Sequence, residues 1–177
     1  MPGQLKEAMV RPKLKKESLD LQEYLNFHPI FNLKFVSKII EWAIALQVKN
    51  YISDNNLDES LQSAYKHLHG TETALVKVQN DILCAIDDNK GAALLLWDMY
   101  RAFDTVGYRL PLDRMCNHFG LRGQVLKWFE SYIHNRKQFV MIDGVKSDVK
   151  DLQFGVPQGL VLGPILYSLY ISPWAIL

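Results

Sequence analysis

The stretch from Leu152 to Leu177 constrains the fold most, because it contains no Asp, Glu, Lys, Arg or His. A stretch of this length without charged side chains is expected to be buried, either in a protein core or in a membrane. Roughly 20 apolar residues are enough to cross a bilayer. It also holds glycines and prolines such as Gly155 and Pro173, which suit an isolated lipid-facing helix poorly because the helix must close its backbone hydrogen bonds internally. We therefore expect a buried element whose covering partner is missing, in preference to a membrane anchor formed by residues 160–177.

The charge of the chain is small overall but unevenly distributed. The 177 residues are about half apolar with a formal net charge of +1, which allows one domain, or a domain and a half, with a sizeable core. Two basic clusters each contain a single acid: Lys6, Arg11, Lys13, Lys15 and Lys16 form the first, and Arg122, Lys127, Arg136 and Lys137 form the second. Either cluster could contact phosphate or be a solvated face.

Cysteine usage and the N-terminus indicate an intracellular protein, in cytoplasm or nucleus. Cys84 and Cys116 are far apart and form no C-x-x-C pair, which disfavours zinc and a disulfide framework. Their apolar surroundings predict buried thiols. The N-terminal "MPGQLKEAMV" lacks the apolar core of a signal peptide.

Periodicity and turn signals predict an α+β chain in which helices outnumber strands. The "FVSKIIEWAIALQVKNYI" segment has apolar residues at helical spacing: Phe35, Val36, Ile39, Ile40, Ala43 and Ile44. Asp143-Gly144 between two strand-like segments is a hairpin signal. The expected elements are a helix over 33–53, a loop, a helix from near Thr71, a strand at "AALLLW", helices near 110–119 and 123–135, the hairpin, and an apolar helix after "VPQG".

Asp98 follows that apolar run directly, in "LLLWDMYRAFDTV". A carboxylate at the end of a buried strand is costly unless a helix cap, an ion pair or a metal stabilises it. Carboxylates suit hard ions such as Mg²⁺, which binds through one or two carboxylates together with substrate phosphates. One acid does not complete a two-metal site, which needs a further carboxylate nearby.

Four motifs in order resemble the reverse transcriptases of non-LTR (LINE-type) retrotransposons, with jockey-, CR1- and L2-like elements as the expected nearest relatives. The "LLLWDMYRAFDTV" segment resembles the first catalytic motif, D-x-x-x-x-F-D-x-V, and "FGVPQGLVLGPILYSLYI" resembles G-V-P-Q-G-S-V-L-G-P-x-L-F. Upstream, "LNFHPIFNLKFVSKIIE" is similar to N-Y-R-P-I-S-N-L-P-x-x-S-K-I-x-E, and "LQSAYKHLHGTETAL" is similar to Q-S-G-F-R-x-G-H-S-T-E-T-A-L. The resemblance implies part of a right-hand polymerase, with residues 1–90 fingers-like and 91–177 a partial palm.

The resemblance also assigns roles to single residues. Asp98 would be the catalytic carboxylate that bridges two Mg²⁺ (or Mn²⁺) ions, and the backbone carbonyl of Met99 would join the metal shell. Phe103 would lie under the incoming sugar and exclude a ribose 2′-OH. Gln158 would touch that sugar, and Gly159 would let the backbone approach the nucleotide. Lys66 stands where the family has an arginine that grips triphosphate or template, and it lacks the bidentate fork.

Some of the family's features do not occur in this sequence. The aromatic-Ala-Asp-Asp motif, the thumb and the endonuclease domain have no counterpart in these residues. The fragment is therefore expected not to polymerise unaided. It also departs from the family pattern within the motifs, at His28, Phe31, Lys34, Leu68 and Leu160.

The resemblance implies an RNA template, a DNA primer and a dNTP as partners. An alternative is a catalytically dead remnant that still binds RNA or RNA–DNA hybrid, through Lys13, Lys15, Lys16, Lys66, Arg136 and Lys137. Self-association through an uncovered C-terminal helix is a further expectation, because exposed apolar faces associate. That helix would present Leu162, Ile165, Leu166, Leu169 and Ile171.

Overall fold

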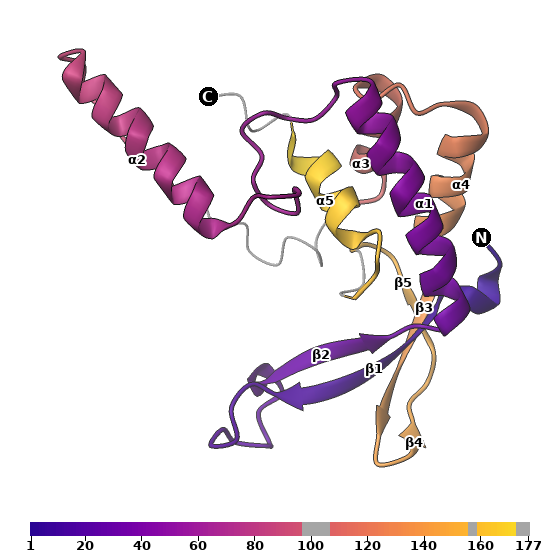
Figure 1. Ribbon diagram of the computed structural model, residues 1–177. Helices are drawn as coiled ribbons and strands as arrows, with labels where there is room; N and C mark the ends of the chain where they lie inside the picture. Colours follow the sequence, from indigo (N-terminus) through magenta and orange to yellow (C-terminus); the bar gives the residue numbers. More distant parts are fainter. Residues whose placement is uncertain (97–106, 156–158, 173–177) are drawn as a thin grey trace.

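The computed structural model describes residues 1–96, 107–155 and 159–172, and it combines helices with one mixed sheet (Figure 1). The strands are β1 (Glu7–Leu14), β2 (Phe27–Asn32), β3 (Arg136–Ile142), β4 (Val145–Lys146) and β5 (Lys150–Leu152). The α-helices are α1 (Phe35–Asp54), α2 (Thr71–Asp87), α3 (Arg109–Asn117), α4 (Gly123–Ile133) and α5 (Gly163–Ile171). Short 3₁₀ turns cover Gly3–Leu5 and Tyr24–Asn26.

The sheet joins the N-terminal hairpin to the strands that follow α4. Its order is β2-β1-β3-β4, and β5 pairs with the first residues of β3. β1 runs antiparallel to β2 and parallel to β3, where Glu7 lies opposite Lys137. Pro12 and Pro29 face each other in the β1–β2 pair, beyond the part of β1 that pairs with β3. Proline is tolerated at such an edge because no further strand needs its missing N–H.

The hydrophobic core lies among four helices, α1, α3, α4 and α5, at one end of the sheet (Figure 1). Phe129 and Tyr132 from α4 and Met115 from α3 are completely buried there. Leu166 and Leu169 of α5 join the same cluster, together with Val48 and Ile52 of α1 and others. This core holds the helices against the start of β1 and β3.

Most of the predicted elements are confirmed. α1, α2, α3, α4 and α5 match the five expected helices to within a few residues, and residues 55–70 form the expected loop. β3 and β4 form the hairpin, with Asp143 and Gly144 at φ 49° and 83° in its two-residue turn. Positive φ at both positions is what a type I′ turn requires.

The orientation of α1 differs from its sequence pattern. Phe35, Val36 and Ile39 are exposed, at 75%, 54% and 51%. The buried face instead carries Ser37 and Glu41 beside Ala45, Val48 and Ile52. The cause is a set of polar contacts made by the buried face, which the apolar spacing of a helix cannot reveal.

The strand predicted for "AALLLW" does not form in residues 92–96. These residues have no regular structure, and Leu95 and Leu96 are 72% and 81% exposed. A strand requires neighbours for its N–H and C=O groups. Among the described residues, the five strands pair with one another and none borders this run. Trp97 lies outside the described residues.

The C-terminal apolar helix is covered, so the expectation of an uncovered α5 was wrong for its main apolar residues. Leu162, Ile165, Leu166 and Leu169 are at most 7% exposed because α1, α3 and α4 pack around α5. Large exposed apolar residues lie elsewhere, several of them on α1 and on α2, a helix that projects from the body and buries no residue (Figure 1). Within the described ranges, no helix is both long and apolar enough to span a membrane.

The prediction of buried thiols was also wrong. Cys84 is exposed because it lies on α2, and Cys116 on α3 is partly exposed. Both are free cysteines.

Candidate functional site

The predicted metal and nucleotide residues fall only partly within the described structure. Asp98, Met99 and Phe103 lie outside the described residues, as does Gln158. Gly159 and Lys66 are described. The structure therefore tests the surroundings of the P-Q-G turn (Pro157–Gly159) and leaves the metal roles as predictions.

Gly159 closes the P-Q-G turn in a conformation that favours glycine. Its φ is +90°, in the region that side chains rarely adopt. A Cβ atom at this position would lie 3.4 Å from the carbonyl oxygen of Phe31 on β2. The end of the turn is thereby fixed close to the edge strand of the sheet.

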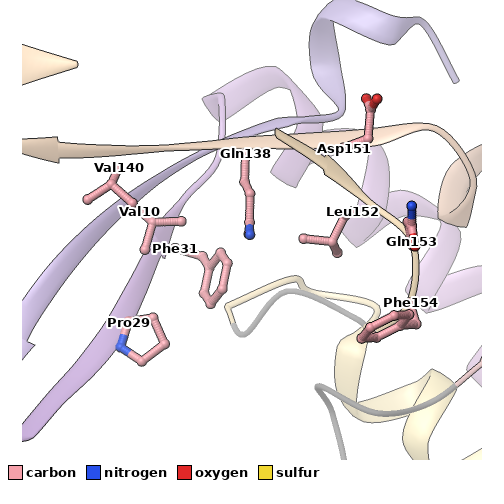
Figure 2. Close-up of a pocket in the computed structure, with 10 residues that line it drawn as sticks. Val10, Pro29, Phe31, Gln138, Val140, Asp151, Leu152, Gln153 and Phe154 are labelled. Carbon is pink, nitrogen blue, oxygen red and sulfur yellow. The ribbon is translucent and has the colours of Figure 1, made fainter. Parts of the chain in front are cut away.

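A pocket of about 460 Å³ lies beside this turn. Figure 2 shows Phe31 of β2 and Gln138 of β3 directed to the same side of the sheet, toward Leu152 and Phe154. The pocket also includes Gly155, two residues before the turn. Phe31 lines this pocket, and its carbonyl oxygen is the atom closest to a Cβ placed on Gly159.

Gln138 supplies a polar group to an otherwise mostly apolar lining. Its Oε1 atom is buried, and no donor in the described part of the chain reaches it. A buried amide oxygen without a partner is costly, and a ligand donor would relieve that cost. Sequence reasoning missed Gln138 and gave Phe31 only as a departure from the family pattern, because the pocket combines strands that are far apart in the chain.

Arg136 lies in the interior, so the structure does not support the surface contact with nucleic acid that was predicted for it. It is 1% exposed, and its Nη1 atom donates to the carbonyl oxygen of Tyr132 at 3.0 Å. The guanidinium also stacks over the Tyr132 ring, 5.0 Å from its centroid. Arg136 is buried because it is the first residue of β3 and therefore lies next to the C-terminal end of α4.

Lys6 accompanies Arg136 in this interior. Its Nζ donates to the carbonyl oxygens of Ser131 and His134 at 3.0 Å each, which ties the chain before β1 to the end of α4. Burial lowers the pKa of Lys6, and the neighbouring Arg136 charge lowers it further. The cation thus serves the fold by satisfying carbonyls at the C-terminus of a helix.

The other predicted basic residues occupy separate places. Lys13, Lys15 and Lys16 are exposed at the outer end of the β1–β2 hairpin, which projects from the body (Figure 1). Lys137 lies opposite Glu7 at the other end of β1, about 20 Å along the strand from Lys13 at 3.3 Å per residue. The structure therefore brings the first three lysines together and separates them from Lys137.

Lys66 is held within its own loop. Its side chain is partly buried, and Nζ donates to the carbonyl oxygen of Glu59 at 3.2 Å. The loop carries positive φ angles at Tyr65 and Leu68, of 61° and 60°. Leu68 stands where the family motif has glycine, and its left-handed backbone is a conformation that glycine adopts more readily than leucine.

The burial of Tyr132 predicts that the free energy of unfolding falls at alkaline pH. Burial raises the pKa of Tyr132 well above its ordinary value; the Glu41 charge adds to this rise and Arg136 opposes it. The folded state therefore keeps a proton that the unfolded state loses above pH about 10. Stability is fully retained below that pH and falls as pH rises beyond it. Burial raises the pKa of Tyr108 too, which acts in the same direction.

Replacing Tyr132 with phenylalanine should make urea unfolding less sensitive to pH between about 10 and 12. The difference in slope approaches about 1.4 kcal/mol per pH unit, the value for one proton. The exposed Tyr24→Phe variant is the control. Equal slopes for Tyr132→Phe and the unchanged protein would contradict the expectation.

The described residues contain no group of three or more His, Cys, Asp or Glu side chains placed to hold a metal ion. Asp98, the predicted metal carboxylate, lies outside them.

Comparisons with known proteins agree with the motifs. The family model described as reverse transcriptase (RNA-dependent DNA polymerase) matches residues 14–175. The chain is 31% identical over 157 residues to the RNA-directed DNA polymerase from mobile element jockey of Drosophila funebris, covering 89% of this chain and 17% of that protein. It is 29% identical over 155 residues to the probable RNA-directed DNA polymerase from transposon BS of Drosophila melanogaster, covering 83% and 16%.

The chain thus spans about one sixth of the length of these curated relatives. The family match contains both the segment around Asp98 and the P-Q-G turn, and the mixed helix and sheet structure is consistent with a polymerase fold. Because the match covers most of its residues, the chain belongs to the reverse transcriptase (RNA-dependent DNA polymerase) family.

Proposed function

We propose that the chain forms part of the fingers and palm of an RNA-directed DNA polymerase from a non-LTR retrotransposon. Residues 1–90 would belong to the fingers and 91–177 to the palm. The observation that carries this proposal is the family match over residues 14–175, which includes both sequence motifs assigned to the nucleotide. RNA template, DNA primer and dNTP are then the proposed partners.

The proposed metal site fits the chemistry of Mg²⁺ in its donor atoms. The Asp98 carboxylate and the Met99 carbonyl are oxygen donors, which Mg²⁺ prefers, and substrate phosphates and water commonly complete its shell. When bound, Mg²⁺ would neutralise charge that develops on the triphosphate. Mn²⁺ takes the same class of ligand.

The nucleotide would lie between Asp98 and the P-Q-G turn. Phe103 is proposed to pack under the sugar and reject a 2′-OH, and Gln158 to touch the same sugar. The left-handed Gly159 and the adjacent pocket support this placement, because they give the turn a fixed end next to an open space. Lys66 is proposed to face triphosphate or template as a point charge.

Lys13, Lys15 and Lys16 are proposed to contact the phosphates of the template–primer duplex. They project from the hairpin tip without an ion-pair partner in the described structure. Lys137 is a weaker candidate, because Asp151 lies 3.9 Å from its Nζ atom and competes for its charge. Contacts of this kind release counterions and are therefore salt-dependent.

Hybrid binding tests this part of the proposal. Fluorescence anisotropy with labelled poly(rA)/oligo(dT), across about 50 to 300 mM salt, should give a log–log slope that becomes less steep by about 2 to 3 when Lys13, Lys15 and Lys16 are changed together to glutamine. The matched control changes Lys49, Lys77 and Lys90, which are exposed elsewhere, and removes the same charge. Equal effects of the two triple variants would contradict a specific contact.

A second candidate function is binding of RNA or hybrid without chemistry. The observation that favours it is the group formed by Lys13, Lys15 and Lys16, which are exposed together at the outer end of the β1–β2 hairpin. Phosphate contacts need no metal, so this function would survive Asp98→Ala and would not depend on dNTP. Binding of hybrid together with metal-dependent binding of dNTP separates the first function from the second.

A further inference from the structure

Two polar residues on the buried face of α1 match the serine and the glutamate of the S-K-I-x-E segment, for which the resemblance specifies no role. Ser37 and Glu41 are both 0% exposed, one turn apart on the helix. Burying a carboxylate is strongly unfavourable unless its oxygens are paired. Ser37 and Glu41 are nevertheless buried, while some apolar residues of the same helix, such as Trp42, are exposed to solvent.

Both oxygens of Glu41 have partners. The Ser37 hydroxyl donates to Oε1 at 2.9 Å, and the backbone N–H of Val161 donates to Oε2 at 2.8 Å. The second contact joins residues that are 120 positions apart. A backbone N–H held by a carboxylate is a charge-assisted hydrogen bond, stronger than a neutral one.

Val161 is the second residue after the P-Q-G turn, so Glu41 holds the segment that leaves the turn. Leu160 and Leu162 on either side are buried, at 4% and 0% exposed, and fix the same segment in the core. Gly159 on the other side of Leu160 lies against the Phe31 carbonyl. The backbone from Leu160 to Leu162 is thereby held by α1 and by the core, and Gly159 before it lies close to β2.

We propose that Glu41 is a positioning residue for nucleotide binding: its buried carboxylate clamps the Val161 N–H and thereby holds the segment Gly159–Leu162, in which Gly159 is proposed to let the backbone approach the nucleotide. This role rests on the proposed function. Ser37 orients the carboxylate by occupying its other oxygen. The clamp acts through the backbone and does not itself touch nucleotide.

Three substitutions separate positioning from a general effect on folding. Glu41→Leu removes the acceptor with little change in volume. Glu41→Gln keeps one carbonyl oxygen for Val161 and lets its NH₂ donate to the Ser37 hydroxyl, which can accept as well as donate. Ser37→Ala disturbs the same interior but leaves the bond to Val161.

The readout is the Kd for dTTP in the presence of Mg²⁺ and poly(rA)/oligo(dT), measured beside the Kd for the hybrid. Glu41→Leu is expected to raise the Kd for dTTP about tenfold or more, as befits the loss of a hydrogen bond to a charged group. Glu41→Gln should restore it to within about threefold, since the neutral bond is weaker but present. Ser37→Ala should raise the Kd for dTTP less than Glu41→Leu does, because the bond to Val161 remains, and the hybrid Kd should not change in any variant.

A folded Glu41→Leu protein that binds dTTP as the unchanged chain does overturns the proposal, as does a Ser37→Ala effect of equal size. If Glu41→Leu does not fold, Glu41→Asp replaces it: one methylene shorter, it keeps the charge but cannot reach Val161, and normal dTTP binding would again overturn the role. If the unchanged chain binds hybrid but no dTTP, the proposed function itself fails, and the positioning role fails with it. Faster amide exchange at Val161 in Glu41→Leu reports loss of the clamp independently of nucleotide.

Discussion

Changing Asp98 to alanine is expected to weaken Mg²⁺-dependent binding of dTTP by about tenfold or more, and to leave hybrid binding unchanged. The carboxylate is proposed to hold the metal that bridges protein and triphosphate, so its loss removes a direct ionic link. The hybrid is proposed to bind through lysines at the β1–β2 tip, which do not depend on metal. Equilibrium dialysis of labelled dTTP with poly(rA)/oligo(dT) measures the first effect, and anisotropy measures the second.

Asp148→Ala is the matched control for this substitution. Asp148 is an exposed carboxylate between β4 and β5, so its removal changes the net charge equally without touching the proposed site. Omitting Mg²⁺ should reduce the unchanged protein to the level of Asp98→Ala. Metal-dependent dTTP binding that persists in Asp98→Ala would mean that the metal is held by other residues.

Changing Phe129 to alanine is expected to lower the free energy of unfolding by about 3–5 kcal/mol. Phe129 on α4 is 0% exposed at the centre of the helical core, with the Trp128 ring against it at 5.3 Å between centroids. Truncation loses the transfer free energy of the ring and leaves a cavity that close-packed neighbours fill only in part.

Urea denaturation followed by circular dichroism measures this loss of stability. Phe154→Ala removes the same side chain from a position that is 59% exposed, and should change the free energy of unfolding by no more than about 0.5 kcal/mol. A loss below about 1 kcal/mol for Phe129→Ala would contradict a core centred on α4.

Sequence patterns predicted the helices well because helix signals are local. Thr71 with Glu72 after it marks the start of α2, and Asp143-Gly144 fixes the turn between β3 and β4. Such signals depend on neighbours within a few residues, so they are readable without knowledge of the whole fold.

The same patterns gave wrong or missing predictions where contacts between residues far apart in the sequence determine the structure. The apolar spacing of α1 indicated the wrong buried face, because the bond from Val161 to Glu41 comes from far along the chain. β1 was missed because its sequence mixes Pro12 with Arg11 and Lys13, while its position depends on β3. The run at 92–96 has the composition of a buried strand but no neighbouring strand in the described structure.

The residues of the candidate site also fall into two groups: those that the sequence motifs identify and those that only the structure identifies. The family motifs supplied Asp98, Phe103 and Gln158 as sequence positions, and their roles remain predictions. Only the structure shows that Phe31 and Gln138 line a pocket beside the P-Q-G turn. Only the structure shows Arg136 buried, since a basic residue in a basic cluster gives no sign of whether it faces water or the core.

The central claim is that these residues carry the nucleotide-binding part of a template-directed polymerase, and the choice of nucleotide tests it most directly. The measurement is retention of dTTP and dGTP by the folded, hybrid-bound chain with Mg²⁺, on poly(rA)/oligo(dT) and then on poly(rC)/oligo(dG). The account predicts that dTTP is retained about tenfold or more better on the first template and dGTP on the second, because base pairing places the nucleotide against the P-Q-G turn. Equal retention of both nucleotides on both templates, or retention of neither, would contradict it.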